Sequence, residues 1–312
     1  SSEASLVIAN HALTMAVAAR GGTDLPARIV FDEGHHLFDA ADSAFSLLLS
    51  GGEAIELRRW LLGPEAAGRR SGRRRGLAAR LQDVASYDSA GAAAIEALLS
   101  AARLLPSDGW LDRLVAGEPE GPVEALLAAI RTQVLTRTED DERGFSLETD
   151  IADLLPGVVE AADAAAAALD RLGRAMASLR ACLSLIVADP PEWLDSQGVA
   201  RMEAADAGLA DRGMLLSAWG GLLARVGGAP DPDHVDWFAL MRAGGQERDA
   251  GIFRHWLDPM KPLAGAVLAR AHGVAVTSAT LGASGGEEVA LSAAGAPHLA
   301  VQPRLFVAPS PF

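Results

Sequence analysis

The chain has 312 residues, of which half are apolar, and a formal net charge of −14 at pH 7. No apolar run approaches the ~20 residues of a membrane span, and no basic region of the signal-peptide kind precedes the first apolar stretch. The single cysteine, Cys182, excludes a disulfide framework, a zinc site built on several cysteines and a four-cysteine iron–sulfur cluster within this segment. We expect a largely helical protein of the reducing cytoplasm, long enough for two domains.

The acidic balance also bears on partners. Phosphate binding needs local Lys and Arg, so a net negative charge argues mildly against a protein that coats DNA. A motor enzyme can nevertheless be acidic overall and keep a basic track.

Two short apolar runs near the N-terminus have the composition of β-strands. The first covers residues 6–9 and leads into a small helical stretch, and the second covers residues 27–31. Short apolar strands separated by helix-sized spacers predict a parallel α/β sheet. The second run ends abruptly in the sequence Asp32-Glu33-Gly34-His35-His36.

From residue 39 to residue 230 the sequence is rich in Ala and Leu, with apolar residues at helical spacing. The stretch 161–185 contains no Val, Ile or Thr, which makes it the clearest helix. The region predicts an all-helical insertion of roughly 190 residues, the size of a domain. The helices are expected near 40–62, 76–104, 121–137, 147–188 and 200–226.

Strand signals return after residue 230. The runs 235–240 and 251–257 predict two strands joined by a polar, glycine-containing turn, and a short helix is expected near 261–271. A last apolar strand, 273–276, then leads into Thr277-Ser278-Ala279-Thr280. The fold class predicted from this order is α/β with a parallel sheet, interrupted by the helical insertion.

The two strand ends carry residues suited to nucleotide hydrolysis. A buried parallel strand that ends in two carboxylates can present a magnesium ligand and a water-activating base. Asp32 would hold Mg²⁺ through water, and Glu33 would point to the other side and polarise the attacking water. His35 can hydrogen-bond toward the Ser/Thr strand end, whereas His36 is expected to be structural or partner-facing. The plain alternative is a surface turn after a core strand.

With these motifs the chain resembles superfamily 2 helicases. Asp32-Glu33-Gly34-His35 matches their Asp-Glu-x-His (DEAH) box, and Thr277-Ser278-Ala279-Thr280-Leu281 matches their third motif. Residues 7–13 are similar to the Asn-His segment of the DinG and XPD group, and residues 255–259 look like DinG-type bacterial members. The middle of the chain resembles this group only in being a long helical insertion where the arch domain sits.

The resemblance implies a first RecA-like motor domain formed by residues 1–38 and 231–312, with an arch-like domain at 39–230. It also implies ATP and Mg²⁺ as cofactors and ATP-dependent unwinding of single-stranded or forked DNA, usually 5′ to 3′, in repair or replication. Thr277, Ser278, Ala279 and Thr280 would couple hydrolysis to movement. Protein partners are not indicated.

Three parts that the resemblance implies are not expected in this chain: the phosphate-binding loop, the cysteines that hold an iron–sulfur cluster in some members, which would lie upstream of Ser1, and the second motor domain, which would follow Phe312. The family's phosphate-binding loop needs a lysine before a hydroxyl residue, and the only lysine, Lys261, precedes Pro262. We therefore expect an internal fragment of a larger protein, which alone hydrolyses ATP negligibly. The alternative is an inactive helicase-like scaffold whose helical insertion binds a partner protein. An RNA helicase of the Asp-Glu-x-His type is disfavoured because such proteins lack so large an insertion.

Weaker signals concern DNA contacts. Asn10 and His11 could contact DNA or equally brace the motor domain. Trp237 and Trp256 could stack on bases, although packing against the core is favoured. An arginine cluster could touch DNA phosphates, but a solvated loop is the favoured reading. The cluster consists of Arg69, Arg70, Arg73, Arg74 and Arg75.

Overall fold

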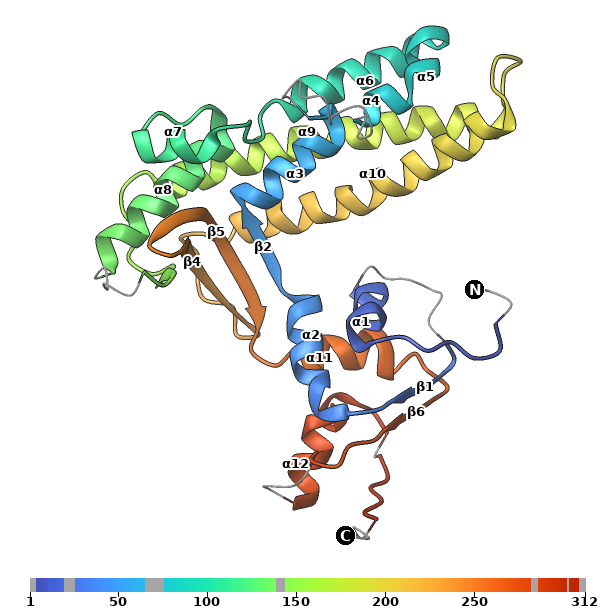
Figure 1. Ribbon diagram of the computed structural model, residues 1–312, viewed down its shortest axis with the longest axis vertical. Coiled ribbons are helices and arrows are strands. Elements are labelled where there is room, and N and C mark those ends of the chain that lie inside the picture. Colours follow the sequence, from blue (N-terminus) through green and yellow to red (C-terminus); the bar gives the residue numbers. More distant parts are fainter. Residues whose placement is uncertain are drawn as a thin grey trace. The chain divides into compact units, whose positions relative to one another are not determined.

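The structure is a computed structural model that describes residues 4–19, 26–64, 76–138, 144–281, 286–301 and 303–308. It is a mixed α/β protein with many helices and a small parallel sheet. The chain divides into two compact units, which are treated separately below (Figure 1). Unit 1 contains residues 1–46, 231–235 and 255–312, and unit 2 contains residues 47–230 and 236–254.

This division differs from the predicted one at both boundaries. Helix α2 (Leu37–Phe45) packs on α1 (His11–Ala19) and on α11 (Met260–Leu263), so it belongs to unit 1 rather than to the insertion. Residues 236–254, which we expected in the α/β part, belong to unit 2 because they share a sheet with its strands.

Unit 1 is organised around two parallel strands that lie side by side in Figure 1. Strand β1 (Arg28–Phe31) pairs with β6 (Gly273–Val276) in a register that joins Phe31 to Val276. Both strands were predicted, and the structure confirms them. The remaining elements of unit 1 are the turn η1 (Gly34–His36), a π-helical turn (Ala264–Leu268), α12 (Gly286–Ala293) and the short turn η4 (Ala296–His298).

The strand predicted at residues 6–9 is wrong. These residues have no regular secondary structure, and the side chain of Ile8 is 90% exposed. A β-type composition is insufficient there because a strand needs a neighbour to bond its backbone and a surface to cover its side chains.

Among the described residues, only one face of the parallel sheet is covered. Phe31 is buried in a small core shared with the helices of unit 1, whereas Val30 is 70% exposed and its register partner Ala275 is also exposed. In the part of the chain that the structure describes, β1 and β6 have no further strand beside them. The core consists of Met15, Ala18, Phe31, Leu37, Ala41, Met260, Leu263, Ala264, Val267 and Leu268.

Unit 2 contains a four-stranded antiparallel sheet in the order β2-β5-β4-β3. The central pair, β4 (His234–Ala243) and β5 (Gln246–Trp256), confirms the predicted strand pair. Its turn is Gly244-Gly245, and both residues have positive φ, 60° and 78°. A two-residue hairpin turn of this kind favours glycine, which adopts positive φ without strain.

The prediction that the insertion is all-helical is wrong, because β2 (Leu47–Ser50) and β3 (Leu147–Asp150) lie within it. Strand β2 pairs with β5 and strand β3 pairs with β4. Both are only four residues long. In the apolar run of β2 periodicity does not separate strand from helix, and β3, with the sequence Leu-Glu-Thr-Asp, is too short and too polar to give a strand signal. Pairing with the long hairpin decides their conformation.

The rest of unit 2 is helical, as predicted for most of the region. The two longest helices, α9 (Val158–Ala188) and α10 (Ser196–Leu223), lie side by side, and α9 also packs on α6 (Ser89–Ala102) and α8 (Gly121–Arg137) (Figure 1). The other helices are α3 (Gly51–Leu62), α4 (Leu77–Arg80), α5 (Gln82–Tyr87) and α7 (Trp110–Ala116).

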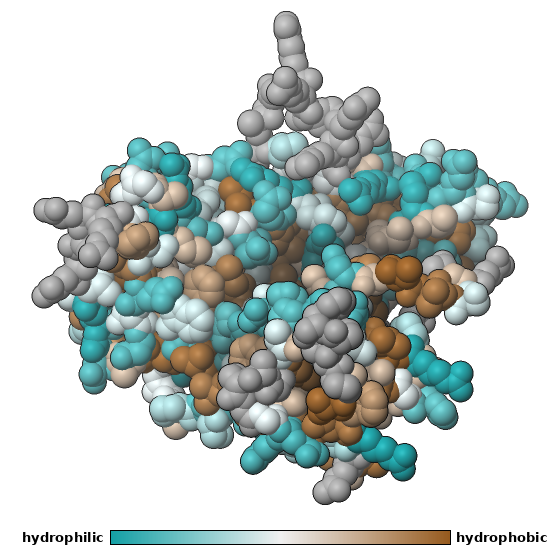
Figure 2. Space-filling view, turned by 60° about the horizontal axis from the view of Figure 1, so that its bottom comes forward, coloured by the Kyte–Doolittle hydropathy of each residue, from teal (hydrophilic) through white to brown (hydrophobic). Residues whose placement is uncertain are grey.

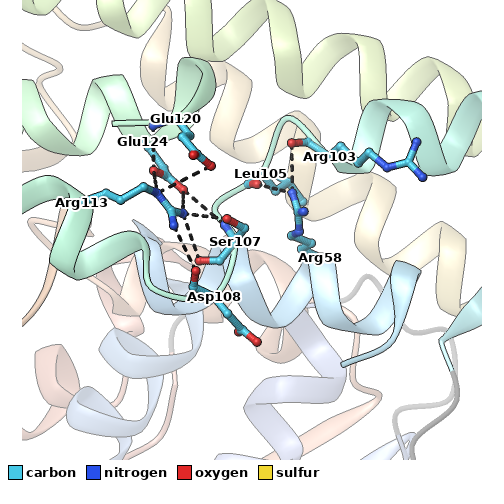
Figure 3. A network of polar contacts seen from close by, with 8 residues as sticks. All are labelled: Arg58, Arg103, Leu105, Ser107, Asp108, Arg113, Glu120 and Glu124. Carbon is cyan, nitrogen blue, oxygen red and sulfur yellow. Dashed lines mark hydrogen bonds and ion pairs between the residues drawn. The ribbon is translucent and has the colours of Figure 1, made fainter. Parts of the chain in front are cut away.

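Polar contacts, with Glu124 buried among them, stabilise the connection between α6 and α8 (Figure 3). Arg113 donates to both carboxylate oxygens of Glu124, whose side chain is 1% exposed, and Arg58 donates to the carbonyl oxygens of Arg103 and Leu105. Burial by itself would raise the pKa of Glu124, but the bonds from Arg113 and from two backbone amides lower it overall. Glu124 is therefore held as a carboxylate in the core.

Apolar side chains reach the surface in patches between hydrophilic ones (Figure 2). Among the described residues of unit 1, the most exposed include Leu6, Ile8, Val301, Phe306 and Val307. No helix within the described ranges combines the length and the apolar character that crossing a membrane requires.

Candidate functional site

The two motifs singled out in the sequence meet at the carboxyl ends of β1 and β6. Asp32 follows β1 directly, and Thr277 follows β6. The Thr277 hydroxyl donates to Asp32 Oδ1 at 2.8 Å, and the Thr277 amide donates to the carbonyl oxygen of Phe31 at 2.8 Å. Parallel strands end at the same edge of a sheet, which is why residues so distant in sequence become neighbours.

Gly34 lets the turn after β1 lie directly against β6. Its amide donates to the carbonyl oxygen of Thr277 at 2.8 Å, and the residue is buried. A Cβ atom at this position would lie 2.3 Å from Val276 Cγ1, far inside the ordinary carbon–carbon contact distance. The glycine of the Asp-Glu-Gly-His sequence is therefore a packing requirement.

Glu33 has an unusual backbone conformation. Its φ and ψ are both 51°, in the left-handed region that residues other than glycine seldom adopt. Its side chain is 58% exposed, and its Oε2 lies 3.3 Å from His35 Nδ1. Strain of this kind persists where surrounding contacts determine it, as at many functional sites. The Glu33 carboxylate is accessible to a solvent molecule or a ligand.

His35 joins the first motif to the second. Its Nδ1 lies 3.1 Å from Ser278 Oγ, which also accepts the amide of Thr280 at 3.2 Å. The same nitrogen faces both Ser278 and Glu33. A Ser-His-acid nucleophile would need the two ring nitrogens to face different partners, so this arrangement is unsuited to activating Ser278. Ala279 separates the two hydroxyl residues and carries no polar side chain.

Asn10 and His11 lie near this site but make structural contacts. Asn10 Oδ1 accepts the amide of Leu13 at 2.9 Å, so Asn10 acts as the N-cap of α1. The ring of His11 meets the ring of Phe31 edge to face at 5.9 Å. These contacts agree with bracing of the domain, and contact with DNA stays a prediction for both residues. The predicted DNA-contacting arginines, Arg69, Arg70, Arg73, Arg74 and Arg75, lie outside the described residues.

The tryptophans proposed as possible base platforms have ring partners within the protein. Trp237 stacks on Phe253 at 5.1 Å with an interplanar angle of 10°, and Trp256 lies against His234 at 4.1 Å. These contacts agree with the packing alternative that the sequence favoured.

Sequence reasoning missed a set of histidine–aspartate contacts in unit 1. His255 Nδ1 lies 2.8 Å from Asp42 Oδ1, and His298 Nε2 lies 2.6 Å from Asp258 Oδ2. Asp258 also accepts the amide of Met260 at the start of α11. The segment 255–259 could have indicated these contacts, because it supplies one partner of each pair. His255 joins the end of β5 to α2, and Asp258 joins the residues after β5 to His298.

The residues at the strand ends could supply only some of the ligands that a magnesium ion needs. Mg²⁺ is usually held by one or two carboxylates together with waters and substrate phosphates, and Asp32 supplies one such carboxylate. Across the described ranges, no group of three or more His, Cys, Asp or Glu side chains is arranged to hold a metal ion. The remaining ligands would come from phosphates and water.

No protein-family model matches the chain, and no curated protein matches it.

Proposed function

We propose that this chain is part of the motor of an ATP-dependent DNA helicase of the Asp-Glu-x-His type. One observation carries the proposal: two strand ends more than two hundred residues apart are joined by the Asp32–Thr277 and His35–Ser278 hydrogen bonds. A core strand followed by an unrelated surface turn would not need matched polar partners on a second strand.

In this proposal each motif residue has a separate task. Mg²⁺, when bound with ATP, neutralises charge on the β and γ phosphates. Thr277 fixes one oxygen of Asp32, which orients the carboxylate that would hold the ion through water. Glu33, exposed at the turn, orients and polarises the attacking water. His35 and Ser278 transmit a change at the turn to β6.

The phosphate cradle would come from outside these residues. The chain lacks a lysine followed by a hydroxyl residue, and such a loop provides the amides that hold the β and γ phosphates. The open face of the β1–β6 sheet supports the same view, because parallel sheets are normally covered on both faces. The proposed activity therefore belongs to a larger protein that contains this chain.

The test compares the 312-residue chain with a longer protein expressed from the same gene. We expect DNA-stimulated ATP hydrolysis and unwinding only by the longer protein, and a loss of at least a hundredfold in hydrolysis on Glu33→Gln or Asp32→Asn. Glu287→Gln, in α12, is a matched carboxylate control. Hydrolysis by the 312-residue chain alone would refute the missing cradle.

The alternative is an inactive helicase-like scaffold that binds a partner protein. A longer protein that folds but neither binds nor hydrolyses ATP would favour it. DNA rather than RNA as the substrate, and 5′-to-3′ movement, rest on the family resemblance and are tested by unwinding of DNA forks with either a 5′ or a 3′ single-stranded arm.

A further inference from the structure

The ring of His35 needs something to hold it. Its side chain is 37% exposed, so the core does not fix its rotamer. Its Nδ1 is shared between Ser278 Oγ at 3.1 Å and Glu33 Oε2 at 3.3 Å. An exposed imidazole with two competing partners can rotate toward either one and lose the contact with β6.

His36 lies against that ring. The centroids of the two imidazoles are 4.0 Å apart, and their planes meet at 43°. The backbone of His36 is well determined, because its amide donates to the carbonyl oxygen of Glu33 at 3.0 Å and the residue also precedes the first turn of α2. Gly34 holds the same turn against β6. The backbone of His36 is therefore anchored, and its exposed ring is held beside the His35 ring by that backbone position.

We propose that His36 is a positioning residue, whose ring holds His35 with Nδ1 facing Ser278. His35 Nδ1 lies within ion-pair distance of Glu33 Oε2 and at hydrogen-bond distance from Ser278 Oγ. Because a carboxylate is only an acceptor, we assign the proton of neutral His35 to Nδ1. With His36 in place, neutral His35 keeps one tautomer and one ring orientation. If the chain has the proposed helicase function, on which this step rests, a held His35 ring makes the turn after β1 and the end of β6 move together during ATP hydrolysis.

The direct test is nitrogen NMR of the histidine side chains in the 312-residue chain, at a pH where the rings are neutral. We expect the wild type to show His35 protonated on Nδ1. In His36→Ala the ¹⁵N shifts of the two His35 ring nitrogens should move toward each other, because ring orientations and tautomers then average. His36→Phe, which keeps a ring at this place, should restore the wild-type pattern. The control is His272→Ala, an exposed histidine before β6.

Each result decides the proposal. Unchanged His35 signals in His36→Ala would overturn it, and so would a failure of His36→Phe to restore them. In the longer protein, His36→Ala should reduce base pairs unwound per ATP severalfold, while His36→Phe should not. The NMR result needs no nucleotide, so a protein that shows it but hydrolyses no ATP would refute the proposed function and leave the positioning role standing.

Discussion

Replacing Gly34 by alanine tests how tightly the turn after β1 lies against β6. The added Cβ would lie 2.3 Å from Val276 Cγ1, while the next nearest atoms are the Thr277 carbonyl oxygen at 3.4 Å and Val276 Cβ at 3.7 Å. Relief requires a shift of more than about 1 Å toward the normal carbon–carbon distance. Val276 is β-branched and has little rotamer freedom, so the turn must move.

Two effects of opposite sign decide the magnitude. Overpacking of this kind costs about 1–3 kcal/mol. Removing a glycine whose φ is compatible with alanine stabilises by about 0.4–1 kcal/mol through the unfolded chain, and Gly34 is not among the residues with positive φ. We expect a net loss of about 1–2 kcal/mol, concentrated at the strand ends.

Amide hydrogen exchange at Thr277, which donates to Phe31, measures this loss locally. In a Val276→Ala background only the contacts at 3.4 Å and 3.7 Å remain, so Gly34→Ala should become neutral or slightly stabilising. Gly265→Ala, where a Cβ would meet nothing within 4 Å, is the matched control in unit 1. Equal destabilisation by Gly34→Ala in both backgrounds would refute the close contact with Val276.

Three further predictions concern unit 2 and are tested by denaturant unfolding. Glu124 has a lowered pKa, so its charge stabilises the fold above the unfolded value of about 4.5 and this contribution is lost as pH falls through the folded pKa; Glu124→Gln should remove that acid-dependent loss. Asp249 has the opposite sign: burial raises its pKa despite bonds from Ser50 and backbone amides. The stability that its protonated form contributes is full below the unfolded value of about 3.8 and is lost as pH rises through the folded pKa. Asp249→Asn cannot ionise, so the variant should gain stability relative to wild type as pH rises over that range. A pH-independent difference would contradict either assignment. Trp219 is fully buried and donates to the Leu48 carbonyl oxygen at 2.7 Å; Trp219→Phe should cost about 2 kcal/mol, and a loss below about 0.5 kcal/mol would show that the bond contributes little.

The elements that could be predicted are those whose local sequence favours one secondary structure clearly over the other. Arg28–Phe31 is short, β-branched and bounded by a loop and by polar residues, and Val158–Ala188 is long and poor in strand formers, so local preference and burial agree. The strands Leu47–Ser50 and Leu147–Asp150 were missed because pairing with the hairpin, and not local preference, decides them.

The candidate site divides in the same way. That the Asp-Glu-Gly-His and Thr-Ser-Ala-Thr sequences would lie close followed from their places after two apolar strands of one parallel sheet. The left-handed conformation of Glu33, the ring contact of His36 with His35 and the pairing of His255 with Asp42 did not follow from the sequence. Each depends on the tertiary packing of the turn and helices against β6 and α11, which cannot be predicted from residue types and their spacing.

The hydrogen bonds at the strand ends also bear on how the proposed motor would work. They are short-range contacts between exposed side chains, such as Asp32 with Thr277, and each contributes about 1 kcal/mol in water. Bonds of that strength can break and reform during a working cycle, whereas the backbone pairing of β1 with β6 keeps the strands together. The backbone pairing of β1 with β6 would keep the two strand ends in place. The weaker hydrogen bond between Asp32 and Thr277 is one that a bound phosphate could replace. In the proposed motor, ligand binding at Asp32 would therefore change the contact with Thr277 without separating the strands.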